Sequence, residues 1–437
     1  MFAFMMSAYC SGSGKTVITS GISRALTGRG LRIAPYKCGP DYIDTIWQSK
    51  AAGSPAYNLD SVLLDEEDVP ELFSRTSAGF DGAVTEGVMG FFDGADPVTF
   101  LGSSYHIAKI LEIPVIIIID AGNLAAGAAA IVAGIQKLAP EIKLAGVILN
   151  KTRSYRQESL LSKAITAHTP DIPILGALPV DETLSVPSRY MGLSTDNTDN
   201  TETFFEKAAE TVKKYIDLDR ILPLTEYITN KSTKENVKLQ GNKTKTALIA
   251  YDDAFCFYYR STFDLLEHYG YKIQTFSPLA DESFDTADLL LLGGGYPELY
   301  ADKLSAAKNA KRSVSRHHSD GRPVFAEGGG VIYLSKSLKT ETGLYPMTGI
   351  FDTDYEMTAK RRRLGYVRHT YTNMPGHIFH YSRVSDNREP YLGEAQRVNG
   401  EESYPDGFLK RRVYGGYTHF MPTEKSNFFS NFIKGVG

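Results

Sequence analysis

Residues 2–16 read Phe2-Ala-Phe-Met-Met-Ser-Ala-Tyr-Cys-Ser-Gly-Ser-Gly-Lys-Thr16, an apolar run that passes directly into a glycine-rich turn. The apolar part, Phe2–Ser7, predicts a buried strand, and the apolar side chains of Lys15–Arg29 recur at helical spacing. A glycine-rich turn between a strand and a helix is the context of a phosphate loop, because the helix N-terminus attracts anions. The start of the chain therefore predicts a nucleotide-binding α/β domain.

The turn itself, Ser11–Thr16, carries the residue types that bind a nucleoside triphosphate. Its two glycines let backbone N–H groups point at phosphate oxygens. Lys15 supplies a positive charge for the β- and γ-phosphates, and Thr16 supplies a hydroxyl for Mg²⁺. Tyr9 replaces the first glycine of the usual motif, so the loop is a variant. The predicted cofactors are ATP and Mg²⁺. The predicted nucleotide-binding residues are Ser11, Gly12, Ser13, Gly14, Lys15, Thr16 and, as a hydrogen-bond partner of adenine, Asn150.

Strand and helix patterns alternate along the rest of the chain. In the first half, strands are predicted at 31–36, 82–85, 114–120, 144–149 and 172–175, with helices at 125–138 and 157–166. In the second half, strands are predicted at 246–251, 271–276, 288–292 and 323–326, with helices at 263–269 and 297–313. Apolar strands that alternate with helices are typical of a parallel sheet covered on both faces. The predicted fold class is α/β, with two domains that each contain a mostly parallel sheet with helices on both faces.

A polar stretch without a clear period, residues 226–245, separates the two halves and is typical of a linker. A length of 437 residues also favours two domains over one core. The predicted organisation is a first domain at 1–222, a linker at 223–244 and a second domain at 245–437.

Composition is that of an ordinary soluble protein, with 42% hydrophobic and 22% charged residues. The net charge of −4 argues against nucleic acid as a general partner, because binding to the phosphate backbone needs an excess of Lys and Arg. The apolar run 113–119 is far shorter than the ~20 residues of a membrane helix, so no membrane association is expected. Cys10, Cys38 and Cys256 are widely spaced and build no disulfide framework, which predicts a reducing cytoplasm.

Acidic residues follow the predicted strands of the first half. Asp41 and Asp44 lie in one loop, and Glu86 and Asp93 lie in another. Ligands gather at the carboxyl ends of parallel strands, where carboxylates hold Mg²⁺ or orient a substrate. A single acid in a loop would indicate only a surface position, but this group beside a phosphate loop predicts a site.

Ten segments can be matched to one family. They are SGSGKT (11–16), KCGPDYID (37–44), NLD (58–60), EGVMGFFDG (86–94), GVILNK (146–151), DDAFCFYY (252–259), FSPLAD (276–281), LLLGGGYPEL (290–299), AEGGGVIYL (326–334) and GHIFHYS (376–382). In this order they resemble the cobyrinic acid a,c-diamide synthases and their relatives that amidate other modified tetrapyrroles. The resemblance implies a P-loop amide-ligase domain followed by a class I glutaminase-like domain, a role in cobalamin biosynthesis, and a homodimer.

The resemblance also implies a reaction. ATP phosphorylates a carboxylate of the macrocycle, and ammonia, normally released from glutamine by the second domain, displaces the phosphate to give the amide. The implied catalytic residues are Lys15, Asp41, Asp44, Glu86 and Asp93, with Thr16 and Glu86 as metal ligands and Tyr42 and Asp60 as substrate-binding residues. The identity of the macrocycle stays open among cobyrinic acid, hydrogenobyrinic acid, sirohaem and nickel sirohydrochlorin. Whether one or two carboxylates are amidated stays open too.

The second half departs from the family pattern. Gly328 stands where AECGG has its nucleophilic cysteine, and Ile378 replaces the glutamate of GHEFHYS. Formation of a glutamyl thioester needs a thiolate, which glycine lacks. His419 of the implied dyad is retained, as is the glycine segment 293–295 that resembles an oxyanion-hole loop. The second domain is therefore expected to be an inactive glutaminase.

Three interpretations follow from this departure. The chain is a ligase that takes nitrogen from free ammonia or from a partner glutaminase, or a non-catalytic tetrapyrrole-binding or regulatory relative, or an otherwise ordinary enzyme in which Gly328 replaces the thiol. The intact ligase motifs favour the first. A P-loop ATPase of the partitioning type is a more distant alternative, and the segments at 37–44 and 86–94 argue against it.

Overall fold

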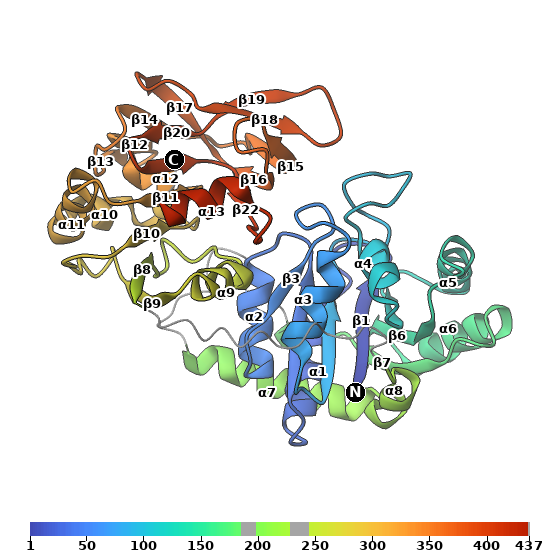
Figure 1. The fold of residues 1–437 in the computed structure, drawn as a ribbon. Coiled ribbons are helices and arrows are strands. Elements are labelled where there is room, and N and C mark those ends of the chain that lie inside the picture. The colour runs from blue at the N-terminus through green and yellow to red at the C-terminus, as the bar shows by residue number, and fades with distance from the viewer. Residues whose placement is uncertain (185–197, 228–243, 436–437) are drawn as a thin grey trace. The chain divides into compact units, whose positions relative to one another are not determined.

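The computed structural model describes residues 1–184, 198–227 and 244–435. The chain divides into two compact units, Met1–Val237 and Lys238–Gly437 (Figure 1). Of the predicted linker at 223–244, residues 228–243 lie outside the described residues. Among the residues described, no helix combines the length and apolarity needed to span a bilayer.

The first unit is built on a parallel sheet of seven strands in the order β3-β2-β4-β1-β5-β6-β7. Its strands are β1 (Phe2–Ala8), β2 (Ile33–Cys38), β3 (Tyr57–Leu59), β4 (Gly82–Glu86), β5 (Val115–Asp120), β6 (Leu144–Thr152) and β7 (Ile174–Pro179). Consecutive residues of β1 and β5 are buried, and successive side chains point to opposite faces, so both faces of the sheet are covered. The strand order reverses beside β1, the place where open α/β sheets bind ligands.

Helices connect these strands. They are α1 (Lys15–Thr27), α2 (Ile43–Ala52), α3 (Asp68–Ser77), α4 (Ser104–Leu111), α5 (Gly127–Leu138), α6 (Tyr155–His168), α7 (Thr198–Tyr215) and α8 (Leu218–Leu224), with a 3-10 turn at Glu182–Leu184. One apolar core joins β1 and β5 to α1, α7 and α8, and its members include Phe4, Ile18 and Val212. The glycine-rich turn therefore connects a central strand to a helix anchored in the core.

The second unit contains a six-stranded sheet in the order β20-β21-β11-β10-β8-β9, in which only β20 runs antiparallel to its neighbour. Its strands are β8 (Lys245–Ala250), β9 (Tyr271–Phe276), β10 (Leu289–Leu292), β11 (Val324–Glu327), β20 (Phe408–Lys410) and β21 (Val413–Gly416). The helical elements are α9 (Arg260–His268), a 3-10 turn at Pro297–Tyr300, α10 (Ala301–Ala306), α11 (Lys308–Ser319), α12 (Gly329–Leu334) and α13 (Asn427–Lys434).

Two further sheets complete the second unit. One has the order β13-β12-β14-β17 and the other the order β19-β18-β15-β16-β22. Their strands are β12 (Ser337–Thr340), β13 (Gly343–Pro346), β14 (Thr353–Met357), β15 (Arg363–His369), β16 (Pro375–His380), β17 (Ser382–Asn387), β18 (Gly393–Arg397), β19 (Ser403–Asp406) and β22 (His419–Phe420). All their pairings except β12 with β14 are antiparallel.

The predicted fold class is confirmed for both halves. The helix predicted at 297–313 is instead a 3-10 turn followed by two helices, α10 and α11, which are separated at Ala307, where ψ is 81°. The two additional sheets were not predicted. Their strands mix exposed charged and buried apolar residues, as in Arg363–His369, and so lack the continuous apolar runs that identified the parallel strands.

Candidate functional site

The phosphate loop contains a glycine whose backbone conformation and close surroundings both disfavour a side chain. Gly14 has φ 92°, and a Cβ there would lie 2.3 Å from Nδ2 of Asn150. That amide donates to the carbonyl of Ser13 over 2.9 Å. Lys151 donates from Nζ to the carbonyl of Gly12 over 2.9 Å. Asn150, predicted to contact adenine, thus holds the loop itself, and its role toward adenine stays a prediction.

Lys15 lies at the end of this loop with its amine turned inward. Its Nζ donates to the carbonyl of Met89 over 2.5 Å and to that of Cys10 over 3.2 Å. Burial, together with the nearby charge of Lys37, lowers the pKa of Lys15. The amine is held by backbone carbonyls at the position where the γ-phosphate of a bound nucleotide is expected.

Glu86 is the centre of a buried polar cluster beside the loop. Its Oε1 accepts from Oγ1 of Thr16 over 2.6 Å and from Nζ of Lys37 over 3.0 Å. Its Oε2 accepts from Nε2 of Gln48 over 2.5 Å. Lys37 also forms an ion pair with Oδ2 of Asp44 at 2.6 Å. Glu86 is 0% exposed and Lys37 3% exposed, so the charges compensate one another away from water.

The pKa shifts in this cluster have opposing causes. Burial, assisted by the neighbouring charge of Asp44, raises the pKa of Glu86 although Lys37 opposes the shift. Burial acts to lower the pKa of Lys37, but Asp44, Glu86 and Asp41 outweigh it and raise that pKa well above its ordinary value. Lys37 therefore stays charged and holds the carboxylates of Asp44 and Glu86 in place through two ion pairs.

The remaining predicted acids organise their own loops. Oδ1 of Asp41 accepts from the N–H groups of Ile43 and Asp44 and so holds the start of α2. Asp60 and Asp93 act in the same way, since Asp60 accepts from two N–H groups of the turn after β3 and Asp93 accepts from Gly90 over 2.8 Å. Tyr42 is buried at the start of α2.

The oxygen atoms of Thr16 and Glu86 are a chemically suitable pair for Mg²⁺. A hydroxyl and a carboxylate are hard ligands, and Mg²⁺ at such sites keeps waters and takes phosphate oxygens for its remaining positions. The 2.6 Å contact between the two side chains brings these oxygens together beside the phosphate loop. Within the described ranges, no cluster of three or more His, Cys, Asp or Glu side chains offers a metal site made of protein ligands alone.

Lys37 and Gln48 belong to the cluster around Glu86 but are not among the residues that the sequence predicts for the site. Lys37 could have been identified from the sequence, because it lies inside the buried strand Ile33–Cys38 and a buried lysine needs a charge partner. Gln48 could not, since it is one of several polar residues on α2 and only the fold turns it toward Glu86.

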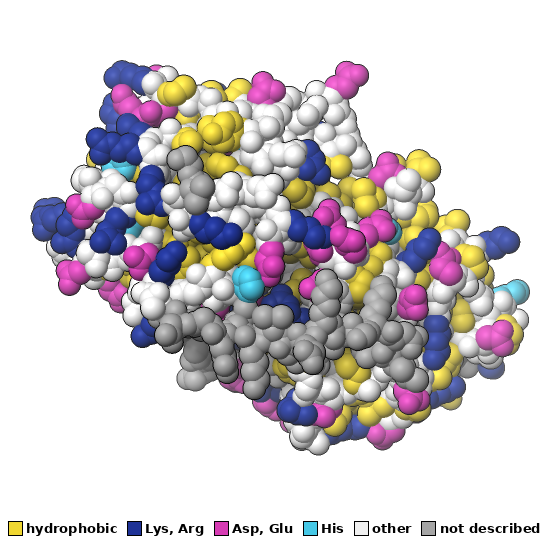
Figure 2. Space-filling model, viewed as in Figure 1, with side chains coloured by type: hydrophobic (Ala, Val, Ile, Leu, Met, Phe, Trp, Pro, Cys, Tyr) yellow, Lys and Arg dark blue, Asp and Glu magenta, His cyan; other side chains and the backbone are white. Residues whose placement is uncertain are grey.

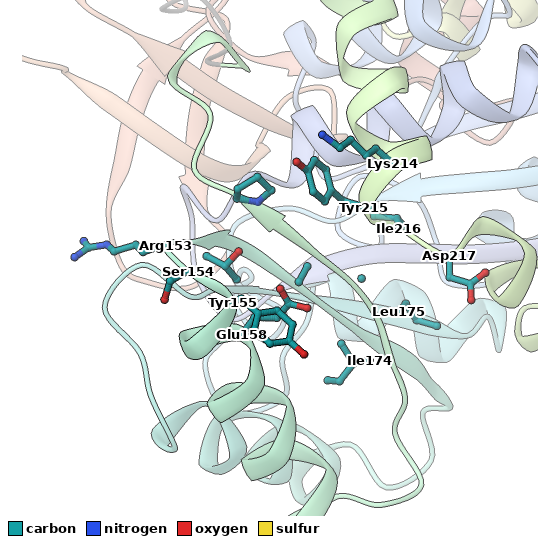
Figure 3. Close-up of a pocket in the computed structure, with 14 residues that line it drawn as sticks. Arg153, Ser154, Tyr155, Glu158, Ile174, Leu175, Lys214, Tyr215, Ile216 and Asp217 are labelled. Carbon is teal, nitrogen blue, oxygen red and sulfur yellow. The ribbon is translucent and has the colours of Figure 1, made fainter.

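A cavity of about 700 Å³ lies along β7, with Arg153, Tyr155 and Glu158 on one side and Lys214–Asp217 on the other (Figure 3). Its lining includes Thr152, just beyond Asn150, but none of the residues predicted for the site.

The second unit has a sharp strand–turn–helix junction at Gly328, between β11 and α12. Gly328 has φ 52° and ψ −111°, a conformation that side-chain-bearing residues adopt rarely and only under strain. A strained turn of this kind holds a nucleophile at the end of a strand in hydrolases. A Cβ on Gly328 would lie 2.4 Å from Nε2 of His419 and 2.5 Å from its Cε1. The imidazole therefore occupies the space that a side chain at this turn would need.

Burial favours the neutral forms of His419 and of the neighbouring Glu327. Burial, with His377 and His380 nearby, lowers the pKa of His419 to about 3. Burial raises the pKa of Glu327 to about 8. Their closest atoms, Nδ1 of His419 and Oε2 of Glu327, lie 3.9 Å apart. Ile378 is 3% exposed and packs in a small apolar cluster, where an ionised glutamate would be unfavourable.

Comparison with known proteins covers both units. Residues 4–193 match the CobQ/CobB/MinD/ParA nucleotide-binding domain, and residues 246–427 match the CobB/CobQ-like glutamine amidotransferase domain. The cobyrinate a,c-diamide synthase of Streptococcus sanguinis is 35% identical over 99% of this chain and 98% of its own length. The synthases of Listeria innocua and Picrophilus torridus are 34% and 36% identical, over 96% and 95% of this chain and 96% and 94% of their own lengths. The chain belongs to the cobyrinate a,c-diamide synthase family of carbon–nitrogen ligases.

Proposed function

We propose that this chain amidates the a and c carboxylates of cobyrinate, or of a related sirohydrochlorin- or sirohaem-type macrocycle, at the expense of ATP. The observation that carries the proposal is the buried cluster that joins Thr16, Glu86 and Lys37 beside the phosphate loop. Such a cluster neutralises and positions charge, which is the main task of a site for phosphoryl transfer.

In the first proposed step, an oxygen of the substrate carboxylate attacks the γ-phosphorus of ATP. The bond from that phosphorus to the β–γ bridging oxygen breaks, and ADP leaves with the electron pair. Lys15 stabilises the charge on the transferring group, and Asp41, Asp44 and Asp93 position the substrate carboxylate, the intermediate or the metal. Mg²⁺ held by Thr16 and Glu86 would neutralise phosphate charge. The product is an acyl phosphate, a far better acyl donor than the carboxylate.

In the second step, the lone pair of ammonia attacks the acyl carbon. The bond from that carbon to the phosphate oxygen breaks, inorganic phosphate leaves, and the nitrogen loses a proton to give the amide. The nitrogen comes from free ammonia or from a partner glutaminase, since Gly328 supplies no thiol and His419 fills the adjacent space.

The test is an assay of the purified chain with cobyrinate, MgATP and either ammonium or glutamine. We expect ADP and the amidated macrocycle, detected by mass spectrometry, with ammonium alone. Lys15→Ala should abolish both products, whereas Lys163→Met, which changes an exposed lysine of α6, should leave them unchanged.

Two outcomes contradict the proposal. Amidation supported by glutamine in the purified chain would show that the second unit releases ammonia without a thiol at 328. Absence of amidation with either nitrogen source would favour a non-catalytic, tetrapyrrole-binding role.

A further inference from the structure

The loop between β4 and α4 exposes apolar side chains next to the phosphate loop. Met89 is 44% exposed and Val98 81% exposed, while Phe92 and Phe100 are half-buried. In Figure 1 this loop extends beyond the carboxyl ends of the strands. In the space-filling view hydrophobic side chains are visible at its end (Figure 2). Exposed apolar side chains occur elsewhere on the chain, and these are distinguished by the contact of their loop with Lys15.

The loop is an ordered structure. The rings of Phe92, Phe100 and Tyr105 pack on one another, with centroids 4.9 to 5.5 Å apart. Asp96 accepts from the N–H groups of Val98 and Thr99, which builds a turn at the tip. The exposed side chains are thus presented on a fixed scaffold.

Two residues of the loop adopt a conformation that is unfavourable for side-chain-bearing residues. Met89 has φ 44° and Phe100 has φ 58°, both in the left-handed region. Backbone held in this way clusters at ligand sites, where the surrounding structure maintains it. The carbonyl of Met89 accepts from Lys15, so the loop contacts the residue predicted to bind the γ-phosphate.

We propose that Met89, Phe92, Val98 and Phe100 form the surface on which the macrocycle of the substrate lies. This inference rests on the proposed function. The carboxylate must reach the γ-phosphate at Lys15, and its short arm keeps the ring close to that point. The loop begins beside that point, since Nζ of Lys15 lies 2.5 Å from the carbonyl oxygen of Met89. A large ring with apolar faces is matched by aromatic and aliphatic side chains.

The test measures binding of cobyrinate to the full chain by its visible absorbance, together with binding of MgADP by calorimetry. Val98→Ser should weaken cobyrinate binding about tenfold, because the proposed aliphatic contact with the ring is lost, and should leave MgADP binding unchanged. Val98→Ile should retain cobyrinate binding. Met89→Gly should also weaken cobyrinate binding. Glycine suits the left-handed backbone at this position and keeps the carbonyl that accepts from Lys15. Leu138→Ser is the matched control, since Leu138 is 58% exposed at the end of α5.

The outcomes separate this inference from the proposed function. Wild-type amidation with unchanged cobyrinate affinity in Val98→Ser and Met89→Gly would overturn the inference and leave the function intact. A change in oligomeric state in place of a change in cobyrinate affinity would identify the loop as a protein-docking surface and also overturn it. A wild-type chain that neither binds nor amidates cobyrinate would overturn both.

Discussion

Replacement of Lys37 by methionine tests the buried cluster most directly. The amine lies 2.6 Å from Oδ2 of Asp44 and 3.0 Å from Oε1 of Glu86, and the side chain is almost completely buried. Methionine keeps the length and removes the charge, which leaves two carboxylates facing each other. Removal of one partner of a buried ion pair costs about 3–5 kcal/mol. We expect a loss of that size in the free energy of unfolding at pH 8, and loss of amidation.

The loss should depend on pH, since the variant can relieve the repulsion by protonating Glu86. The pKa of Glu86 is already raised above 4.5, and without Lys37 it rises further. The folded state then keeps a proton that the unfolded chain has released, so stability falls as pH increases above 4.5. The slope is at most about 1.4 kcal/mol per pH unit for one proton. The destabilisation should therefore be smaller at pH 5 than at pH 8.

The assay is urea unfolding followed by tryptophan fluorescence. The chain has one tryptophan, Trp47, which is buried on α2 against Phe204 and Phe205 and so reports on the first unit alone. Lys163→Met is the control for loss of an exposed lysine in the same unit. A destabilisation below about 1 kcal/mol that is equal at pH 5 and pH 8 would refute the view that Lys37 compensates buried carboxylates.

Three further substitutions test the two sites. Gly14→Ala should weaken MgADP binding at least tenfold by calorimetry, because its Cβ would lie 2.3 Å from the Asn150 amide; unaltered affinity would contradict the loop geometry. Thr16→Val should weaken binding of MgADP but not of ADP in the presence of a chelator, and equal losses would argue against a metal role. Gly328→Cys should lower the calorimetric unfolding temperature and release no glutamate from glutamine, because the new side chain collides with His419. Glutamate release by that variant would show that the histidine moves aside.

Much of the first unit was predictable from local patterns. The apolar runs of β1 and β5 identify strands buried on both faces, and the glycines and Lys15 identify the phosphate loop between β1 and α1. These features depend on residues close together in the chain, where spacing alone constrains the geometry. The positions of Asp44 and Glu86 after predicted strands indicated a site, the family resemblance assigned them roles, and the structure places both in one cluster.

Contacts between residues distant in the chain could not be derived in this way. Asn150 reaches Ser13 over 137 positions because parallel strands bring their carboxyl ends to one edge of the sheet, and Gln48 reaches Glu86 because α2 packs beside that edge. The antiparallel sheets of the second unit were missed for a related reason, since strands with one exposed face mix polar and apolar residues.

The sequence by itself determined that a phosphate loop lies at Ser11–Thr16 and that Gly328 carries no thiol, because both are properties of the residues present. Only the tertiary structure decided what surrounds them. It placed Lys37 between two buried carboxylates, and it put the His419 imidazole within 2.4 Å of the position of a Cβ at 328. Burial and close packing depend on the path of the whole chain. Burial sets the charges in the cluster around Glu86, and close packing sets the space left beside Gly328.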